Sequence, residues 1–387
     1  MRLCIVSETW SPEINGVAHT LSRLCAELLR LGTSIDLIRP RPRISAHDGQ
    51  VEHELQVAHI AVPGYGEVQI GLSSPARLRR FWREHRPDVV YLATQGPLGW
   101  AARRAAQQLE IAVVAGWHTN FDHYCHDYGV AWLEPATRRY LRHFHNGCAL
   151  TLVPTHAQAR ALRLAGIHDV AVMSRGIDGE RFTPQKRDPE LRRRWGVGEH
   201  QAVALYAGRL AAEKNLTLLQ ETFDAMRHAR PDMAQVIIGD GPLKAQLQKA
   251  LPDAHFTGFI DADALARHYA SADLFLFPSL SETWGNVVPE AMASGLAVVA
   301  FDHAASAELI DNGHNGVTLP PGHDAAFRDA AVALCLRPAD YARLGRVARQ
   351  KALEQSWAGI AELFLQHLHH ARESYHASTS ACRIRSS

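Results

Sequence analysis

The stretch SETWGNVVPEAMASGLAVVAFD, residues 281–302, passes from a polar loop through an alanine-rich helix into an apolar strand. Gly285 frees the loop, and Asn286 is a residue type that commonly starts a helix. Glu282 falls in the loop, and Glu290 falls one turn into the helix beside apolar neighbours. An unpartnered carboxylate beside buried residues is costly, so a site for a polar ligand is favoured over two ordinary surface glutamates.

Short apolar runs alternate with helical patterns along the whole chain, which predicts parallel sheets covered by helices on both faces. The runs are LCIV (3–6), VVYLA (89–93), IAVVA (111–115), LTLV (150–153), VALYAG (203–208), QVIIG (235–239), HFTGF (255–259), DLFLFP (273–278) and AVVAF (297–301). A chain of 387 residues exceeds one ordinary core. We therefore predict an α/β protein with two doubly wound, Rossmann-like domains that face each other across a cleft.

The domain boundaries are predicted from one charged, proline-containing stretch and from the end of the chain. TPQKRDPELRRRWGVGEH (183–200) is interpreted as a linker between a first domain over residues 1–182 and a second domain over residues 201–355. A helix over residues 356–377 is expected to pack back toward the first domain. The small, polar residues 378–387 are expected to form a disordered tail.

The composition describes an ordinary soluble globular protein. Apolar residues make up 47% of the chain, charged residues 21%, and the formal net charge is +1, which gives no indication of a nucleic-acid partner. The six cysteines are scattered, as expected for a reducing cytoplasm. The first residues do not have the pattern of a signal peptide, and apolar runs stay far shorter than the roughly 18 residues of a membrane span.

Three further loops follow apolar strands, where an open parallel sheet binds ligands. Asn15 and Gly16 stand before a helix, although a plain strand-to-helix turn explains them equally well. Arg209 and Lys214 follow another strand and suit a diphosphate, with a solvated charge cluster that includes Glu213 as the alternative. In a third loop, IGDGPL (238–243), Gly239 and Gly241 resemble half of a nucleotide-binding fingerprint that lacks its third glycine.

Taken together, these motifs resemble the retaining glycosyltransferases of family 4, which have the GT-B fold. The resemblance spans nearly the whole chain and extends most to bacterial GDP-mannose-dependent mannosyltransferases and to sulfoquinovosyl or glucosyl diacylglycerol synthases. Its carriers are PEINGVAHTL (12–21), TQGPLGWAARR (94–104), HTNFDHY (118–124), TLVPT (151–155), SRGIDGERF (174–182), AGRLAAEKNL (207–216), GDGPL (239–243) and SETWGNVVPEAMASG (281–295).

The resemblance implies a role for each matched residue. Glu290 would hold the ribose hydroxyls and Glu282 the transferred sugar, while Arg209 and Lys214 would stabilise the diphosphate leaving group. His118 matches the family histidine that faces the donor sugar; without the resemblance, a capping or core histidine is the favoured interpretation. The implied catalytic residues are His118, Glu282, Arg209 and Lys214, and the implied donor-binding residues are Asn15, Gly16, Arg209, Lys214, Gly239, Gly241, Asn286, Val287 and Glu290.

The resemblance also implies a hexosyl transfer with retention of configuration from a nucleotide sugar. A lipid or lipid-linked acceptor is expected from the basic, aromatic-rich stretches 77–87 and 121–145. A double displacement needs a carboxylate on the far face of the anomeric carbon, which the sequence does not place, so a front-face substitution is preferred. GDP-mannose is the favoured donor, and a UDP-sugar-dependent diacylglycerol glycosyltransferase is the alternative. A nucleotide-sugar epimerase and an inactive nucleotide-sugar-binding protein are more distant alternatives.

No metal or other cofactor is expected beyond the nucleotide-sugar substrate. His118, His123, Cys125 and His126 lie close in sequence but lack the paired spacing of a structural zinc site. Asp261 with its neighbour Asp263 stands where a helix is predicted to begin, and a helix cap explains the pair most simply.

A basic, aromatic-rich segment of the first domain, residues 121–145, predicts an acceptor-binding or membrane-facing surface. Trp132 would enter the acyl boundary while Arg138, Arg139 and Arg142 meet anionic headgroups, as at an interfacial helix. A second stretch, RLRRFWREHRP (77–87), mixes the same residue types. The alternative is that the aromatic residues belong to the core and the arginines to a solvated face. We expect a cytoplasmic protein, peripheral on the inner face of the membrane, whose oligomeric state the sequence leaves open.

Overall fold

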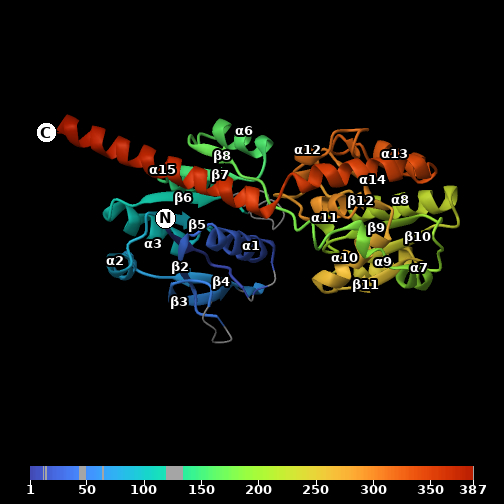
Figure 1. Cartoon of the computed structure of the whole chain (residues 1–387), viewed down its shortest axis with the longest axis horizontal. Coiled ribbons are helices and arrows are strands. Elements are labelled where there is room, and N and C mark those ends of the chain that lie inside the picture. Colours follow the sequence, from blue (N-terminus) through green and yellow to red (C-terminus); the bar gives the residue numbers. More distant parts are fainter. Residues whose placement is uncertain (12, 14, 43–48, 63–64, 119–133, 387) are drawn as a thin grey trace. The chain divides into compact units, whose positions relative to one another are not determined.

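The computed structural model describes residues 1–387 except residues 12, 14, 43–48, 63–64, 119–133 and 387. The chain forms two compact units, one over residues 1–175 and 357–387 and the other over residues 176–356. Figure 1 shows each unit as a sheet between layers of helices. Each unit is therefore a three-layer α/β structure, the class predicted from the alternating apolar runs.

The first unit contains a sheet of eight described strands in the order β4-β3-β2-β1-β5-β6-β7-β8. All neighbours pair in parallel except β3 and β4, which form an antiparallel edge. The strands are β1 (Arg2–Val6), β2 (Ser34–Pro40), β3 (His53–Val62), β4 (Tyr65–Leu72), β5 (Val89–Leu92), β6 (Ala112–Gly116), β7 (Leu150–Val153) and β8 (Val170–Val172). The helices are α1 (Gly16–Arg30), α2 (Pro75–Glu84), α3 (Pro97–Gln108), α5 (Glu134–His145), α6 (His156–Leu164) and α15 (Trp357–Ser386).

Alternation along β1 shows how helices cover both faces of this sheet. Leu3 and Ile5 pack into a cluster with apolar residues of α1 and α15. Cys4 and Val6 point to the opposite face and pack with residues of α2 and α3. A strand buried on both sides has to be apolar at every position, which is why these strands are recognisable as continuous apolar runs.

The second unit contains a fully parallel sheet in the order β11-β10-β9-β12-β13-β14. Its strands are β9 (Val203–Ala207), β10 (Ala234–Ile238), β11 (His255–Gly258), β12 (Leu274–Phe277), β13 (Ala297–Phe301) and β14 (Val317–Leu319). Its helices are α7 (Pro189–Arg194), α8 (Leu216–Ala229), α9 (Lys244–Ala250), α10 (Ala262–Ser271), α11 (Val287–Ala293), α12 (Ala305–Leu309), α13 (Asp324–Cys335) and α14 (Pro338–Leu353), with 3-10 turns η2 (Pro184–Lys186) and η3 (Ala212–Lys214). This strand order is that of a dinucleotide-binding fold, whose ligand site lies where the order reverses, between β9 and β12.

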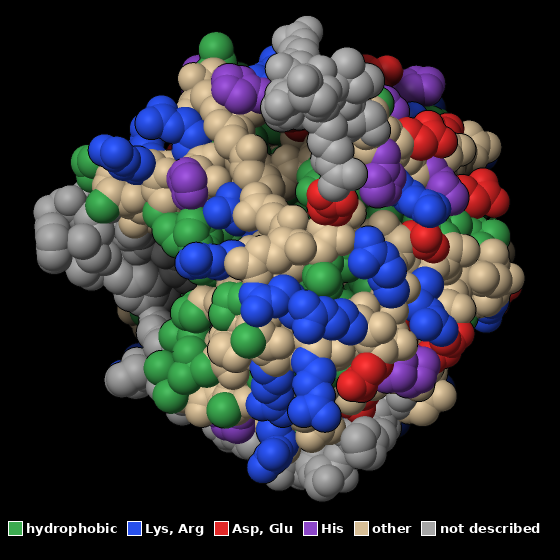
Figure 2. Space-filling view, turned by 90° about the vertical axis from the view of Figure 1, so that its left-hand side faces the viewer, with side chains coloured by type: hydrophobic (Ala, Val, Ile, Leu, Met, Phe, Trp, Pro, Cys, Tyr) green, Lys and Arg blue, Asp and Glu red, His purple; other side chains and the backbone are tan. Residues whose placement is uncertain are grey.

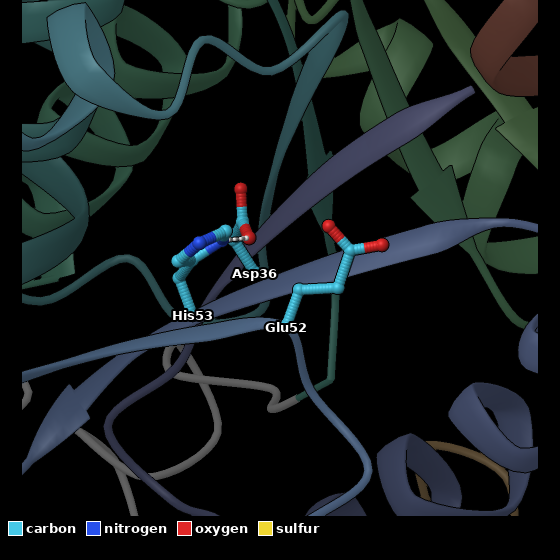
Figure 3. Close-up of side chains that lie close together, drawn as sticks. All are labelled: Asp36, Glu52 and His53. Atoms are coloured by element: carbon cyan, nitrogen blue, oxygen red, sulfur yellow. Dashed lines mark hydrogen bonds and ion pairs between the residues drawn. The ribbon is translucent and has the colours of Figure 1, made fainter.

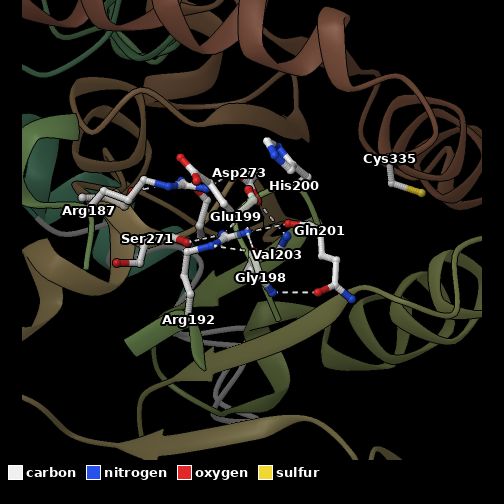
Figure 4. A network of polar contacts seen from close by, with 12 residues as sticks. Arg187, Arg192, Gly198, Glu199, His200, Gln201, Val203, Ser271, Asp273 and Cys335 are labelled. Carbon is white, nitrogen blue, oxygen red and sulfur yellow. Dashed lines mark hydrogen bonds and ion pairs between the residues drawn. The ribbon is translucent and has the colours of Figure 1, made fainter. Parts of the chain in front are cut away.

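The stretch interpreted as a linker, residues 183–200, is instead an integral part of the second unit. Arg187 and Arg192 both pair with the carboxylate of Asp273, at 3.0 and 3.2 Å, and Arg192 also donates to the carbonyl of Ser271 at 2.7 Å (Figure 4). Trp195, further along the same stretch, is buried in the hydrophobic core. Arg187 and Arg192 therefore bind the short segment between α10 and β12, which holds residues 183–200 against the second unit.

The expected disordered tail is also corrected, because α15 runs without interruption to Ser386. No proline or glycine occurs after Gly359 to stop the helix. Trp357, Phe364 and Leu368 of α15 are buried together with Leu21 and Leu24 of α1, so this last helix is part of the first unit's core.

Candidate active site

The point where the strand order of the second sheet reverses brings a cation and a carboxylate together. Lys214 ends the turn η3 after β9, and Glu282 lies in the loop after β12; the Lys214 Nζ donates to the Glu282 Oε1. The hydroxyl of Ser279 donates to the same oxygen at 3.0 Å. The two side chains are only 15% and 16% exposed. A partly desolvated ion pair at this edge is placed to bind a charged, hydroxyl-bearing ligand.

Glu290 lies in α11, beyond the same loop, in a much less polar setting. Its described partner is the hydroxyl of Tyr269, which donates to the Glu290 Oε2 at 3.3 Å. Burial raises the pKa of Glu290 to about 8, and the Tyr269 hydrogen bond opposes the rise. This carboxyl group is therefore largely protonated at neutral pH and can both donate and accept hydrogen bonds.

Gly239 and Gly241 allow the loops after β9 and β10 to touch. A Cβ atom at Gly239, whose φ is +133°, would lie 1.9 Å from the carbonyl oxygen of Gly208, and one at Gly241 would lie 2.4 Å from that of Leu210. Any side chain at either position would separate the two loops. The structure thus gives these glycines a packing role beside the predicted donor-binding one.

Arg209 is placed differently from Lys214. Its side chain is 60% exposed, and its guanidinium lies 3.8 Å from Glu213, as in the solvated-cluster alternative. Asn286 stands at the N-cap position of α11 without a side-chain capping bond, and Val287 is the first helical residue. The structure therefore brings Lys214 and Glu282 into contact and leaves Arg209 at the rim.

In the first unit, Asn15 and Gly16 form a capped helix start. The Asn15 side-chain oxygen accepts from the amides of Val17 and Ala18, at 3.1 and 2.9 Å, and its amide donates to the Thr9 hydroxyl at 2.6 Å. Gly16 is the first residue of α1. This is the local geometry of the plain strand-to-helix turn, and it leaves Gly16 exposed.

His118 follows β6, and its ring is held from one side. The Nε2 atom lies 2.8 Å from the hydroxyl of Tyr91, while the Nδ1 atom is buried without a hydrogen-bond partner among the described residues. Burial, followed by the positive charge of Arg175, lowers the pKa of His118 to about 3. His118 is therefore neutral at physiological pH.

Glu8 is a further candidate that the sequence interpretation missed. It follows β1, its Oε1 atom is buried without a partner in the described part of the chain, and a Cβ on Gly96 would lie 2.3 Å from its carboxylate. Burial raises its pKa to about 7, opposed by the amides of Leu98 and Gly71. A signal was present: the tetrapeptide SETW follows a strand both at residues 7–10 and at residues 281–284.

The side chains of Asp36, Glu52 and His53 lie close enough together to hold a metal ion (Figure 3). His53 Nδ1 lies 2.9 Å from Asp36, and the Arg2 guanidinium binds Glu52 at 2.8 Å and lies 3.9 Å from Asp36. Because Arg2 already supplies positive charge there, an ion-pair network explains the cluster. Asp261, which with Asp263 was the other acidic group considered for a metal ion, has the predicted role of a helix cap. Its carboxylate accepts hydrogen bonds from the amides of residues 263 and 264 at the start of α10.

The basic aromatic surface is only partly as predicted. Arg138, Arg139 and Arg142 of α5 are exposed. Phe144, on the same helix, is fully buried in the core. Trp132 lies outside the described residues. Figure 2 shows Lys and Arg side chains gathered on one end of the first unit.

In the second basic stretch, Trp82 of α2 is fully buried, and its indole NH donates to the Cys4 sulfur at 3.3 Å. Trp82 and Phe144 are therefore core residues, as the alternative interpretation predicted. The exposed part of the proposed surface consists of arginines such as Arg138, Arg139 and Arg142. Over the described residues, none of the helices is both long and apolar enough to cross a membrane.

Comparisons with known proteins agree with the architecture. Residues 14–181 match the model of "Glycosyltransferase Family 4", and residues 201–336 match that of "Glycosyl transferases group 1". The chain is similar to GDP-mannose-dependent alpha-mannosyltransferases of Corynebacterium glutamicum (32% identity, covering 95% of this chain and 88% of the relative) and Mycolicibacterium smegmatis (33%, 95% and 96%). A sulfoquinovosyl transferase of Arabidopsis thaliana is 34% identical over 66% of this chain and 51% of its own length.

The fold is similar to that of solved glycosyltransferase structures. Sucrose-phosphate synthase from Thermosynechococcus elongatus superimposes with a TM-score of 0.78 at 17% identity, covering 95% of this chain and 98% of that one. HepE of Anabaena, in complex with UDP, superimposes with a TM-score of 0.74 at 19% identity, covering 96% and 100%. The GT-B class predicted from the sequence is confirmed. The chain belongs to glycosyltransferase family 4 and is a glycosyltransferase.

Proposed function

We propose that this glycosyltransferase transfers a mannosyl group from GDP-mannose to a lipid or lipid-linked alcohol, with retention of configuration and without a divalent metal ion. The observation that carries the proposal is the contact of Lys214 with Glu282 where the strand order of the second sheet reverses. The choice of donor is supported by the names of two relatives that are 32% and 33% identical over 95% of the chain.

Each charged group at this edge has a distinct task in the proposal. Lys214 places a positive charge where charge develops on the departing diphosphate, and Arg209 adds a second cation from the rim. As Lys214 turns to the phosphate, Glu282 is released to accept hydrogen bonds from the sugar hydroxyls. Glu290, largely protonated in the free protein, meets the ribose hydroxyls as both donor and acceptor.

These two protein cations are the reason why no metal ion is proposed. A diphosphate leaving group needs about two positive charges near it, and Lys214 with Arg209 can supply them. The attacking hydroxyl approaches from the side that the leaving group vacates, through an oxocarbenium-like ion pair. This front-face course needs no protein nucleophile, and the departing phosphate can accept the proton of the acceptor hydroxyl.

The acceptor is proposed to be reached at the surface of the cytoplasmic leaflet. Arg138, Arg139 and Arg142 project from one exposed segment of α5, and each arginine near an anionic membrane contributes about 1 kcal/mol. Tyr140 between them is 41% exposed, and its hydroxyl donates to the Gln95 carbonyl at 2.5 Å, which fixes the ring. The alternative function is a UDP-sugar-dependent diacylglycerol glycosyltransferase, because the sulfoquinovosyl transferase relative is 34% identical.

A donor screen tests the proposal and separates it from the alternative. The melting temperature is measured with GDP, UDP, GDP-mannose and UDP-glucose, and a ligand at a hundred times its Kd stabilises the fold by about 2.7 kcal/mol. We expect stabilisation by GDP and GDP-mannose, followed by mannolipid formation when an acceptor lipid is added. Stabilisation by the uridine ligands alone would establish the alternative, and conversion of the donor without any acceptor would indicate an epimerase.

A further inference from the structure

A buried tyrosine hydroxyl lies against the histidine that the family resemblance places at the donor sugar. Tyr91 is on β5, its side chain is 0% exposed, and its hydroxyl lies 2.8 Å from the His118 Nε2. The ring of Phe364, from α15, packs edge-on against the Tyr91 ring at 5.0 Å. Two strands and the last helix therefore fix the position of this hydroxyl.

Gly116 makes the contact possible. A Cβ atom at this position would lie 2.2 Å from the Tyr91 hydroxyl and 2.6 Å from the His118 Nε2. Because glycine stands there, the hydroxyl and the imidazole can approach across the backbone of β6. The arrangement is built by residues of three different elements.

The hydrogen-bond partners of Tyr91 and His118 indicate which of the two groups donates the proton in their contact. Among the described residues, the His118 ring is the hydrogen-bond partner of the Tyr91 hydroxyl, and nearby Arg175 has no lone pair with which to accept. If the Nε2–H donated to the hydroxyl instead, both the hydroxyl proton and the Nδ1 lone pair would lack a partner among the described residues, whereas donation by the hydroxyl leaves only the Nδ1 atom without one. The hydroxyl therefore donates to Nε2, and a neutral imidazole that accepts at Nε2 carries its proton on Nδ1.

The other ring nitrogen of His118, Nδ1, is buried and has no hydrogen-bond partner among the described residues. A fixed, buried N–H donor without a protein acceptor is suited to an oxygen of a ligand. We propose that Tyr91 is a positioning residue, which holds His118 as the Nδ1–H tautomer so that this N–H donates to a hydroxyl oxygen of the bound donor sugar.

The proposal rests on the proposed function for the identity of the ligand, but the tautomer can be measured without any ligand. In protein with 15N-labelled histidine, long-range proton–nitrogen correlations distinguish the protonated ring nitrogen of each histidine. His145 is an internal control, because its buried ring has two described partners, the Thr151 hydroxyl at 2.9 Å and the Gln95 amide at 3.3 Å. We expect His118 to be Nδ1–H in the wild type, to lose this preference in Tyr91→Phe, and His145 to be unchanged in both.

Turnover gives a second readout that a purely structural role would not produce. Tyr91→Phe is expected to lower kcat about tenfold while the donor KM stays within about twofold, since a hydrogen bond to the reacting sugar is misplaced. Tyr341→Phe, which removes a buried hydroxyl in the second unit, is the control and should leave kcat unchanged. In a His118→Ala background, adding Tyr91→Phe should cause no further loss.

An Nε2–H tautomer in the wild-type spectrum would overturn the proposal without any variant. So would a Tyr91→Phe protein that keeps both the tautomer and the turnover of the wild type. If the tautomer changes as expected but His118→Ala is as active as the wild type, the role of His118 in the proposed reaction fails while the positioning by Tyr91 stands. Equal additional loss from Tyr91→Phe in the presence and absence of His118 would assign the tyrosine a structural role alone.

Discussion

Replacing Lys214 by methionine removes the cation that contacts Glu282 and keeps a side chain of similar length. The Lys214 side chain is only 15% exposed, so an effective dielectric of roughly 20 is appropriate, and a unit charge about 4 Å from a phosphate oxygen is then worth about 4 kcal/mol before desolvation. This corresponds to nearly 10³ in rate, so we expect kcat/KM to fall by about 10² to 10³. Arg209 is 60% exposed, and a dielectric near that of water reduces its expected effect to about fivefold.

The assay is donor turnover with saturating acceptor, measured together with the melting temperature. Lys351→Met is the matched control, because Lys351 is an exposed lysine that pairs with Glu354. The double variant Lys214→Met with Glu282→Gln should be at least as impaired as the single one. Activity of Lys214→Met within threefold of the wild type would refute the reasoning. Recovery in the double variant would show instead that the loss came from an unpaired Glu282 carboxylate.

Four further predictions follow from the same geometry. Glu290→Ala should raise the donor KM while Glu282→Ala chiefly lowers kcat, because one group holds ribose throughout and the other meets the reacting sugar; equal changes in both parameters would contradict these roles. Burial raises the pKa of Glu290 from its ordinary 4.5 to about 8, so the folded form keeps a proton that the unfolded form releases. The free energy of unfolding should then decrease as pH rises from 4.5 to about 8, and the melting temperature of Glu290→Gln should fall less over this range than that of the wild type. EDTA should leave transfer unchanged, whereas a loss that Mg²⁺ or Mn²⁺ restores would refute a metal-independent reaction. Finally, the protein should sediment with anionic vesicles at low salt, and changing Arg138, Arg139 and Arg142 to Glu should abolish this without affecting nucleotide binding; unchanged sedimentation would point to another surface.

Most central strands could be predicted because they are buried on both faces. β5, β9, β12 and β13 consist of apolar residues throughout, and β7 is interrupted only by Thr151, so each of them is visible in the sequence as an apolar run. The edge hairpin of β3 and β4 was not predicted. β3 interleaves His, Glu and Gln with apolar residues, and β4 contains two glycines, so neither shows the apolar run of an inner strand.

The site was predictable residue by residue but not as a set of contacts. Lys214 and Glu282 are 68 positions apart in the sequence, and their contact depends on the reversal of strand order, which no local pattern encodes. Tyr91 stands inside an apolar run where a tyrosine suggests only packing. Its role depends on the neighbouring strand, whose Gly116 leaves room for the hydroxyl to reach His118.

The helix α15 closes the first unit with the last residues of the chain, although the rest of that unit ends at residue 175. During synthesis on a ribosome, the second unit emerges whole while the first still lacks α15, which together with α1 covers one face of its sheet. Until residues 357–371 leave the exit tunnel, the apolar surface that Phe364 and Leu368 later cover stays open. The second unit can therefore complete its fold before the first, although the first unit begins the sequence. A chain that stopped after residue 356 would contain a complete second unit and an incomplete, aggregation-prone first unit.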